Sequence, residues 1–183
     1  MSSSTEEVSA TSSSPNTPKK KGKNPNSLIP INHPEIIFSK ILLHILAENK
    51  KSKDYYKKIE SNKDGHFTFK MVPSISLLDY LRRILKYLRI EFSTLIIAMI
   101  YIDRICKEKV FLNEYNIHRI MIIAIYIAYI YNEDCTYDIK YLSLVSGLNK
   151  NEVLLLEEEF LELIEFNLFV NEKTFGQYKA FFY

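Results

Sequence analysis

The sequence predicts an all-α protein in which several helices pack around one buried central helix. Apolar residues recur at helical spacing from residue 34 onward, and residues that favour helix ends separate the apolar stretches. Residues 120–131 contain no charge and no amide, which predicts a helix that other helices enclose. No hairpin turn or alternating apolar run indicates a strand.

Length and charge limit the classes of protein. The 183 residues suit one domain with a hydrophobic core plus a tail. The formal net charge is +2, and residues 1–27 account for it with four lysines against two glutamates. The body of the chain is therefore near neutral, which disfavours a nucleic-acid partner because phosphate neutralisation supplies most of the affinity in such complexes.

Composition divides the chain into four parts. Residues 1–27 form a Ser/Thr/Pro/Lys tail that we expect to be disordered. In this tail Ser14 and Thr17 precede prolines and are candidate phosphorylation sites, and the lysines after Pro18 resemble an import signal, although such short motifs often match by chance. Residues 28–73 hold an N-terminal helix and a polar linker, residues 74–168 the main helical domain, and residues 169–183 a short C-terminal helix.

The N-terminal part predicts one helix followed by a polar connection. Pro34 suits a first helical turn, and apolar residues follow it at helical spacing as far as Leu46. Residues 49–70 are polar and rich in lysine. Residues 60–65 resemble half of a calcium loop, but the twelfth position is Met71 instead of a bidentate glutamate, so we expect a turn there and no calcium site.

Five helices with short connections are expected in the main domain. Capping residues and apolar spacing set their ranges: Ser76 to Leu88, Ser93 to Lys107, Asn113 to Tyr131, Tyr137 to Ser146, and Asn149 to Ile164. Gly147 is a natural stop for the fourth helix. The third is apolar on every face, and Ala124 and Ala128 allow its neighbours to approach closely. A last short helix is predicted over 172–181.

The apolar segment is too short to cross a membrane, and the two cysteines indicate a reducing compartment. Its twelve residues fall short of the roughly 20 that span hydrocarbon. Cys106 and Cys135 are expected to be free thiols, and we expect no signal peptide at the start of this sequence. We therefore expect an intracellular protein of the cytoplasm, the nucleus or both, without a membrane partner.

No catalytic, cofactor or metal motif is found. The four histidines have no metal-ligand spacing with one another or with the cysteines, and the phosphate-loop and nucleophile-elbow patterns are absent. His118, at the start of the central helix, is expected to be satisfied by local hydrogen bonds. The glutamates between residues 157 and 165 are expected to be mostly a solvated face. A binding module without a cofactor or a small-molecule substrate is therefore favoured over an enzyme.

Several short stretches, in this order, resemble a cyclin box. They are residues 76–84 (SLLDYLRRI), 98–104 (AMIYIDR), 116–120 (NIHRI), 145–148 (VSGL), Leu156-Glu157 and 166–168 (FNL). Their order and spacing are similar to those of P/U-type cyclins, the group that contains the yeast phosphate-regulation cyclins. The resemblance implies a cyclin-box fold of five helices around a buried third helix, here with one box and extra helices at both ends.

The resemblance also implies a function and a site. Cyclins bind a cyclin-dependent protein kinase and hold its αC helix inward, which completes the kinase's Lys–Glu pair. The kinase-facing residues implied here are Ile130, Tyr131, Asn132, Glu133, Asp134, Glu157, Leu161, Phe166 and Leu168, although core packing is an equal alternative for Phe166 and Leu168. Structural roles are implied for Asp103 and Arg104, which would tie helices together near the N-terminal side, and for His118, Arg119 and Gly147.

One departure from the family pattern leaves a second interpretation open. Most cyclins have a lysine at the position of Ile130, and that lysine meets the interface glutamate, here Glu157. Without it, either the partner supplies a lysine or an arginine to Glu157, or the glutamate stays exposed and kinase docking is weak, altered or absent. The alternative is a cyclin-fold interaction module that does not activate a kinase. A nucleic-acid-binding cyclin fold and an unrecognised enzyme are less favoured, the former because the body is neutral and has one box.

Overall fold

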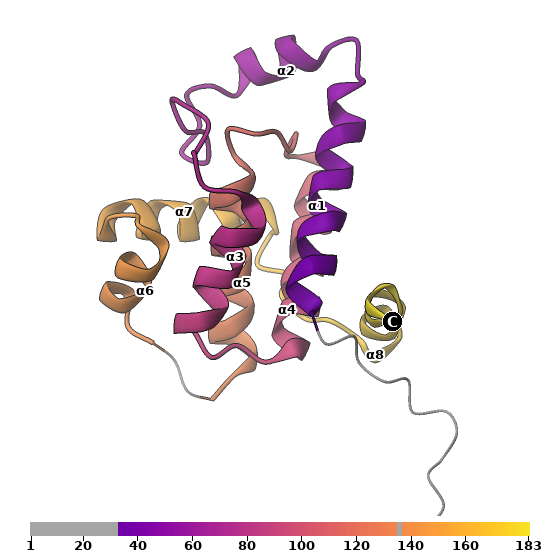
Figure 1. Cartoon of the computed structure of the whole chain (residues 1–183), viewed down its shortest axis with the longest axis vertical. Coiled ribbons are helices and arrows are strands. Elements are labelled where there is room, and N and C mark those ends of the chain that lie inside the picture. Colours follow the sequence, from indigo (N-terminus) through magenta and orange to yellow (C-terminus); the bar gives the residue numbers. More distant parts are fainter. Residues whose placement is uncertain (1–32, 135–136) are drawn as a thin grey trace, which may run out of the picture.

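The computed structural model describes residues 33–134 and 137–183, and within these ranges it is all-helical, as predicted (Figure 1). The elements in chain order are α1 (Pro34–Lys50), α2 (Tyr55–Ser61), α3 (Leu77–Tyr87), α4 (Phe92–Glu108), α5 (Ile117–Asn132), α6 (Ile139–Ser146), α7 (Lys150–Leu163), α8 (Glu172–Lys179) and a short 3₁₀-helix, η1 (Ala180–Phe182). The predicted tail with Ser14 and Thr17 lies outside the described residues, as does Cys135. Cys106 is a free thiol.

The central helix of the fold is α5, and it is enclosed as its sequence predicts. Every residue from Ile120 to Tyr129 is buried. Its closest neighbour is α4, and α3 and α7 pack on its other sides. Ala124 and Ala128 are fully buried, so the small side chains lie where neighbouring helices come close. Each buried isoleucine of this helix contributes about 1.5–3 kcal/mol through the hydrophobic effect.

Three of the predicted helix ends form as their local sequence indicates. The Ser76 hydroxyl accepts a hydrogen bond from the Asp79 backbone N–H at 3.1 Å, at the start of α3. Asn149 and Glu152 form a reciprocal capping box at the start of α7. Gly147 ends α6 with φ of 76°, in the left-handed region that glycine adopts without strain.

The starts of α4 and α5 differ from the prediction. The N-cap of α4 is Glu91, not Ser93, and the cap acceptor comes from elsewhere in the chain: the Glu133 carboxylate accepts from the Glu91 backbone N–H at 3.1 Å and from the Thr94 hydroxyl at 2.7 Å. The N-cap of α5 is Asn116, not Asn113. Asn113 instead closes the preceding turn, where its side chain accepts from the Tyr115 backbone N–H.

The predicted polar linker contains one more helix, α2. Its residue Tyr55 is buried, packs edge-on against Phe111, and donates its hydroxyl hydrogen to the Glu114 carboxylate. Asn49 adds a bond to the Leu112 carbonyl at 2.8 Å. Because only one side chain of this two-turn helix is buried, apolar residues do not recur at helical spacing there. The hydrophobic pattern of the sequence therefore did not predict α2. The fourth helix of the main domain also starts later than expected, after Asp138.

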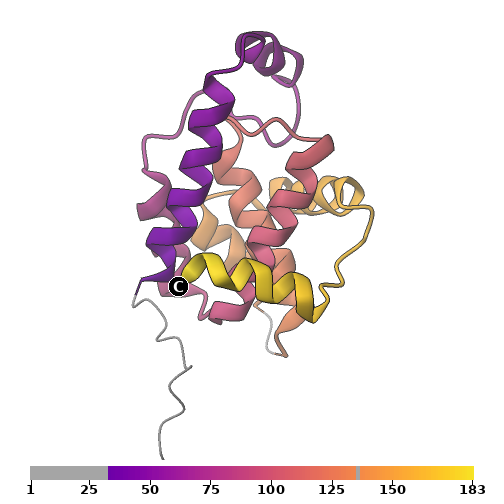
Figure 2. The ribbon, with the colours of Figure 1, turned by 90° about the vertical axis from the view of Figure 1, so that its right-hand side faces the viewer.

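The C-terminal helix lies across α4 beside α1 (Figure 2). It begins after Asn171, whose side chain accepts from the Thr174 backbone N–H at 2.8 Å. At its far end Phe182 is buried and meets Phe92 edge-on at 5.4 Å between ring centroids. The predicted helix over 172–181 thus forms as α8 followed by η1, and it covers α4 rather than the C-terminal end of α5.

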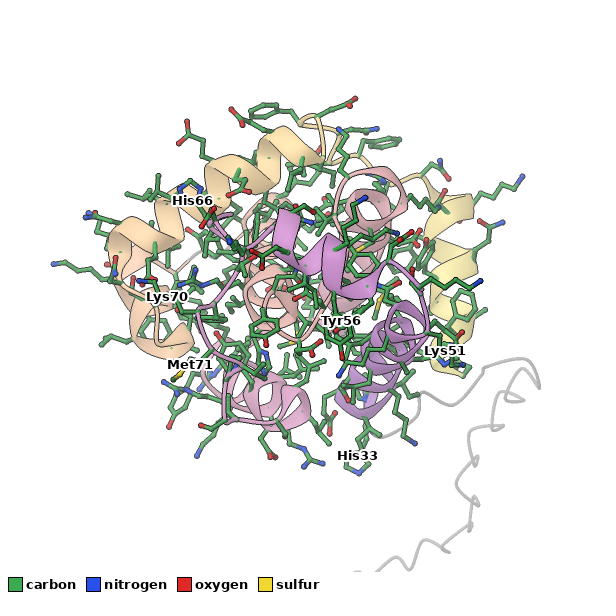
Figure 3. All side chains as sticks on the ribbon, turned by 90° about the horizontal axis from the view of Figure 1, so that it is seen from above. His33, Lys51, Tyr56, His66, Lys70 and Met71 are labelled. Atoms are coloured by element: carbon green, nitrogen blue, oxygen red, sulfur yellow. The ribbon has the colours of Figure 1, made fainter. Side chains whose placement is uncertain are left out.

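Arg119 joins the linker to the main domain. Its guanidinium donates to the His66 carbonyl and to the Glu152 carboxylate, and it lies over the Phe69 ring at 4.1 Å. His66 lies beside α7 (Figure 3), and its Nδ1 is 2.9 Å from the Glu159 carboxylate. The guanidinium is mostly buried, which makes such charge-assisted bonds stronger than exposed ones.

Enlarging Ala124 tests the enclosure of α5. Ala124→Leu is expected to lower the free energy of unfolding by about 1–3 kcal/mol, because the added methylenes must displace close-packed neighbours. Ala47→Leu is the matched control, since Ala47 lies exposed on α1, and it should change stability by less than about 0.5 kcal/mol. Urea unfolding followed by circular dichroism measures both. Equal small effects in the two variants would show that α5 is not tightly enclosed.

Candidate functional site

The C-terminal end of α5 and the segment after α7 meet beside Tyr101. This tyrosine is fully buried in α4, and its hydroxyl donates to the Leu168 carbonyl at 2.7 Å. The side chain of Asn132 also reaches that hydroxyl. Burial raises the pKa of Tyr101 to about 12, so the hydroxyl keeps its hydrogen and remains a donor at neutral pH. Two predicted site residues far apart in the sequence are thereby held together.

We use the term tip face for the predicted kinase-facing set: residues 130–134 at the end of α5, and Glu157, Leu161, Phe166 and Leu168 on and after α7. Side chains of α5 lie close to side chains of α7. Arg119 of α5 pairs with Glu152 of α7. Burial raises the pKa of Tyr126, and the nearby Glu157 carboxylate raises it further. Ile130 and Leu161 follow one turn further along each helix.

Exposure separates the members of the tip face. Tyr131 is 52% exposed and Phe166 is 68% exposed, and Asn132 and Asp134 are also exposed. Ile130, Leu161 and Leu168 are partly buried and pack against the core. Core packing therefore describes Leu168, but it does not describe Phe166.

Glu133 does not face outward. Its carboxylate is bonded to the start of α4, at the end of a helix where backbone N–H groups favour a negative charge. Glu133 therefore belongs to the tip face by position, but its carboxylate joins the end of α5 to the start of α4.

Glu157 is half-buried and makes no hydrogen bond or ion pair with any described residue. Ile130 occupies the position where most cyclins carry a lysine, so the expected cation is missing from this chain. Burial raises the pKa of Glu157, because removing water disfavours the charged carboxylate. A carboxylate in this environment is a ready acceptor for a cation from a partner.

The turn after α7 holds Phe166 in an uncommon backbone conformation. Glu165 and Phe166 have φ of 55° and 53°, in the left-handed region that residues with side chains seldom adopt. The ammonium of Lys109 bonds both the Leu163 carbonyl at 2.8 Å and the Glu165 carboxylate at 2.6 Å. The turn is therefore fixed by Lys109, the residue that follows α4, and strained backbone of this kind clusters at functional sites.

Asp103 and Arg104 join α4 to the C-terminal part of the chain, not to the N-terminal side as the resemblance implied. The Arg104 guanidinium donates to the carbonyls of Asn167 and Phe169. Asp103 accepts from the Tyr178 hydroxyl of α8 and pairs with Lys107 at 2.9 Å. Arg104 thereby positions the segment that follows Phe166.

His118 is buried, and its hydrogen bond is not local as expected. Its Nε2 lies 3.1 Å from the Ile75 carbonyl, before α3, and its ring packs against Tyr80. Burial lowers the pKa of His118, so the ring is neutral at physiological pH. The Nδ1 atom has no hydrogen-bond partner among the described residues.

Three residues that support or extend the tip face were not predicted. Tyr101 of α4 and Lys109, which follows α4, hold it in place. Phe169, 69% exposed, lies three residues after Phe166 on the segment that Arg104 fixes. Tyr101 lies in the stretch that resembles the family pattern, but its role depends on a contact with residue 168 that no local pattern reveals.

In the ranges that the structure describes, none of the helices has the length and apolar character needed to span a bilayer. No group of three His, Cys, Asp or Glu side chains gathers there as metal ligands would.

Comparison with known proteins identifies relatives. The chain matches the family model described as Cyclin over residues 2–168. Cyclin-U4-3 of Arabidopsis thaliana is 36% identical over 124 residues, which are 67% of this chain and 57% of that protein. Cyclin-U2-1 of the same plant is 33% identical over 144 residues, 78% of this chain and 64% of that protein. The PHO85 cyclin-like protein psl1 of Schizosaccharomyces pombe is 36% identical over 115 residues, 61% of this chain and 47% of that protein.

The chain thus spans about half to two thirds of the length of these relatives. The matched region contains the five helices α3 to α7 and the enclosed α5. Together, the match and the architecture show that the chain belongs to the cyclin family, with relatives among the P/U-type cyclins.

Proposed function

We propose that this chain is the regulatory subunit of a cyclin-dependent protein kinase, which it binds through the tip face and activates by holding the kinase αC helix inward. Family membership supports the regulatory role, and the name of the fission-yeast relative links that protein to a PHO85 cyclin. The observation that carries the proposal is the exposure of Tyr131, at the end of the otherwise enclosed α5, and of Phe166, after α7. The Glu157 carboxylate of α7 adds to it, because it has no hydrogen-bond or ion-pair partner among the described residues.

Activation is a shift of population between two kinase shapes. Moving a kinase from one per cent to ninety-nine per cent active requires the cyclin to bind the active shape by about 5.5 kcal/mol more tightly. Aromatic anchors such as Tyr131 and Phe166 are the side chains that most often supply interface energy. Both project from rigid elements, so little ordering is needed when a partner binds.

The unpaired carboxylate of Glu157 calls for a positively charged side chain on the partner. The kinase surface opposite it carries a lysine or an arginine, which replaces the cation that Ile130 does not provide. Pairing then satisfies a carboxylate that the free chain leaves half-buried without a partner. In this arrangement the interface cation belongs to the kinase instead of the cyclin.

Ile130 also favours the alternative, a cyclin-fold interaction module that does not activate a kinase. In that case the tip face binds a scaffold or another regulatory protein. Affinity purification of the full chain from its own cells, with mass spectrometry, separates the two: a kinase catalytic subunit is recovered under the proposal and is absent under the alternative.

Reversing the charge at Glu157 tests the interface. With the recovered kinase reconstituted, Glu157→Arg is expected to reduce activation about tenfold or more, because two cations would then face each other without solvent. Glu158→Arg is the matched control, since Glu158 is the exposed neighbour on α7, and it should leave activation within about twofold. Activation that survives Glu157→Arg unchanged would remove Glu157 from the interface.

The raised pKa of Glu157 predicts a pH-dependent gain in stability on neutralisation. A glutamate whose folded pKa is raised adds stability below its unfolded pKa, and this stability is lost as pH rises through the folded pKa. Glu157→Gln should therefore stabilise the free chain, relative to wild type, more at about pH 7 than at about pH 4. Urea unfolding at the two pH values measures the difference, and Glu158→Gln should show none. A gain that does not change with pH would contradict the burial argument.

Phe166 is expected to contribute to binding and not to folding. Phe166→Ala should weaken kinase affinity about tenfold, as the loss of an aromatic anchor does, and change the free energy of unfolding by less than about 0.5 kcal/mol. Phe181→Ala is the control, because Phe181 is equally exposed, at 67%, in η1. Isothermal titration with the kinase gives both affinities. Equal losses in the two variants would mean that Phe166 has no specific role.

A further inference from the structure

A groove between α3 and α6 carries positive charge that the proposed kinase-binding role does not use. It measures about 630 Å³ and is lined by Arg82, Arg83, Lys86 and Tyr87 of α3 and by Tyr141 and Leu144 of α6. We call this the α3–α6 groove. It shares no residue with the tip face.

The cations of this groove are poorly neutralised. Arg83 and Lys86 form no ion pair with any carboxylate of the described residues. Arg83 donates to the Leu144 carbonyl at 3.1 Å, and the Lys86 ammonium lies 5.4 Å from the centre of the Tyr87 ring. Arg82 has only long pairs, at 3.8 Å with Asp79 and 4.0 Å with Glu35. Asp79 also lines the groove, so three cations face one carboxylate there.

The groove is fixed before any partner arrives. The Tyr141 hydroxyl donates to the Tyr87 carbonyl at 3.0 Å, which joins the two walls. Below it the Tyr80 hydroxyl donates to the Ser146 carbonyl at 2.8 Å. Tyr141 is further held by a stack with Tyr137, at 4.7 Å between ring centroids. Preorganised walls reduce the ordering that binding requires.

An apolar contact lies beside the charges. Leu144 is 76% exposed and Tyr87 is 46% exposed, both high for large apolar side chains that line a groove. Charged and apolar surface therefore alternate over a short distance, a pattern that fits a peptide better than a nucleic acid, whose backbone offers charge without aliphatic groups.

We propose that the α3–α6 groove docks an acidic protein segment, with carboxylates on Arg82, Arg83 and Lys86 and an aliphatic or aromatic side chain on Leu144 and Tyr87. Arg82 and Lys86 lie about 6 Å apart along the helix, so the charges form a row instead of converging on one point. A row of single charges matches successive Asp or Glu side chains, whereas one phosphate group is matched by cations that converge on it. The groove would therefore recognise its partner by a row of carboxylates and by one apolar side chain.

A labelled peptide of repeated Glu-Glu-Leu units is the probe, and fluorescence anisotropy with the full chain alone, at low salt and at about 0.15 M, is the measurement. The peptide should bind the wild type, and its glutamine counterpart should bind at least about tenfold more weakly. The double variant Arg83→Glu, Lys86→Glu should weaken binding about tenfold or more, and Leu144→Ser should weaken it without changing the salt dependence. No kinase is present, so the outcome is independent of the tip-face proposal.

The matched control is the double variant Lys53→Glu, Lys57→Glu, which makes the same charge change on exposed residues outside the groove. Equal loss in both double variants would overturn the proposal, because binding would then follow net charge. No binding of the peptide to the wild type would also overturn it, as would tighter binding of a single-stranded oligonucleotide of equal length. Arg83→Gln, Lys86→Gln, with an unchanged melting temperature, repeats the test if charge reversal disturbs folding.

Discussion

The helices α3, α4 and α7 enclose α5, and this packing organises the domain. An isoleucine-rich helix without charged residues in its centre is stable only where other helices remove it from water. Because this helix is held in place, its two ends fix the positions of the segments that contact them. Its first turn carries Arg119, which anchors the linker and α7 together, and its last turn meets Tyr101 and the segment after α7. The tip face therefore lies on rigid elements, with loops only where α4 side chains hold them.

Stability and binding are assigned to different side chains in this fold. The core of α5 and its neighbours is mostly apolar, with Thr94 and His118 as buried polar side chains, whereas the tip face keeps a half-buried carboxylate and two exposed aromatic rings. The half-buried carboxylate lowers the stability of the free chain, and so does the left-handed turn at Glu165 and Phe166. Local features that reduce stability are expected at sites that bind, since the partner removes the penalty when it arrives.

The sequence predicted the helix ends that are capped by residues a few positions away. It did not predict the contacts between residues that are far apart in the chain. Ser76 and the Asn149–Glu152 pair cap their helices through neighbours three residues away, so a short window contains the whole interaction. The start of α4 depends on a carboxylate forty-two residues further on, and α2 depends on one buried tyrosine, so no window could show either. In the tip face, the family resemblance supplied the residue positions. The exposure of each of these residues depends on how the helices pack, which the sequence does not show. Glu133 turns inward because the start of α4 lies beside the end of α5.

Hydrogen–deuterium exchange compares the full chain alone with the full chain bound to the kinase that we propose as its partner, and it reports where backbone amides become protected on binding. Because α5 is enclosed, we expect slow exchange across its middle in both states. New protection should be confined to the end of α5, to α7 and to residues 164–169. If protection appeared on α1 and α8 while the end of α5 stayed unchanged, a kinase would bind a face other than the one that the enclosed helix presents, and the tip face would not be the interface.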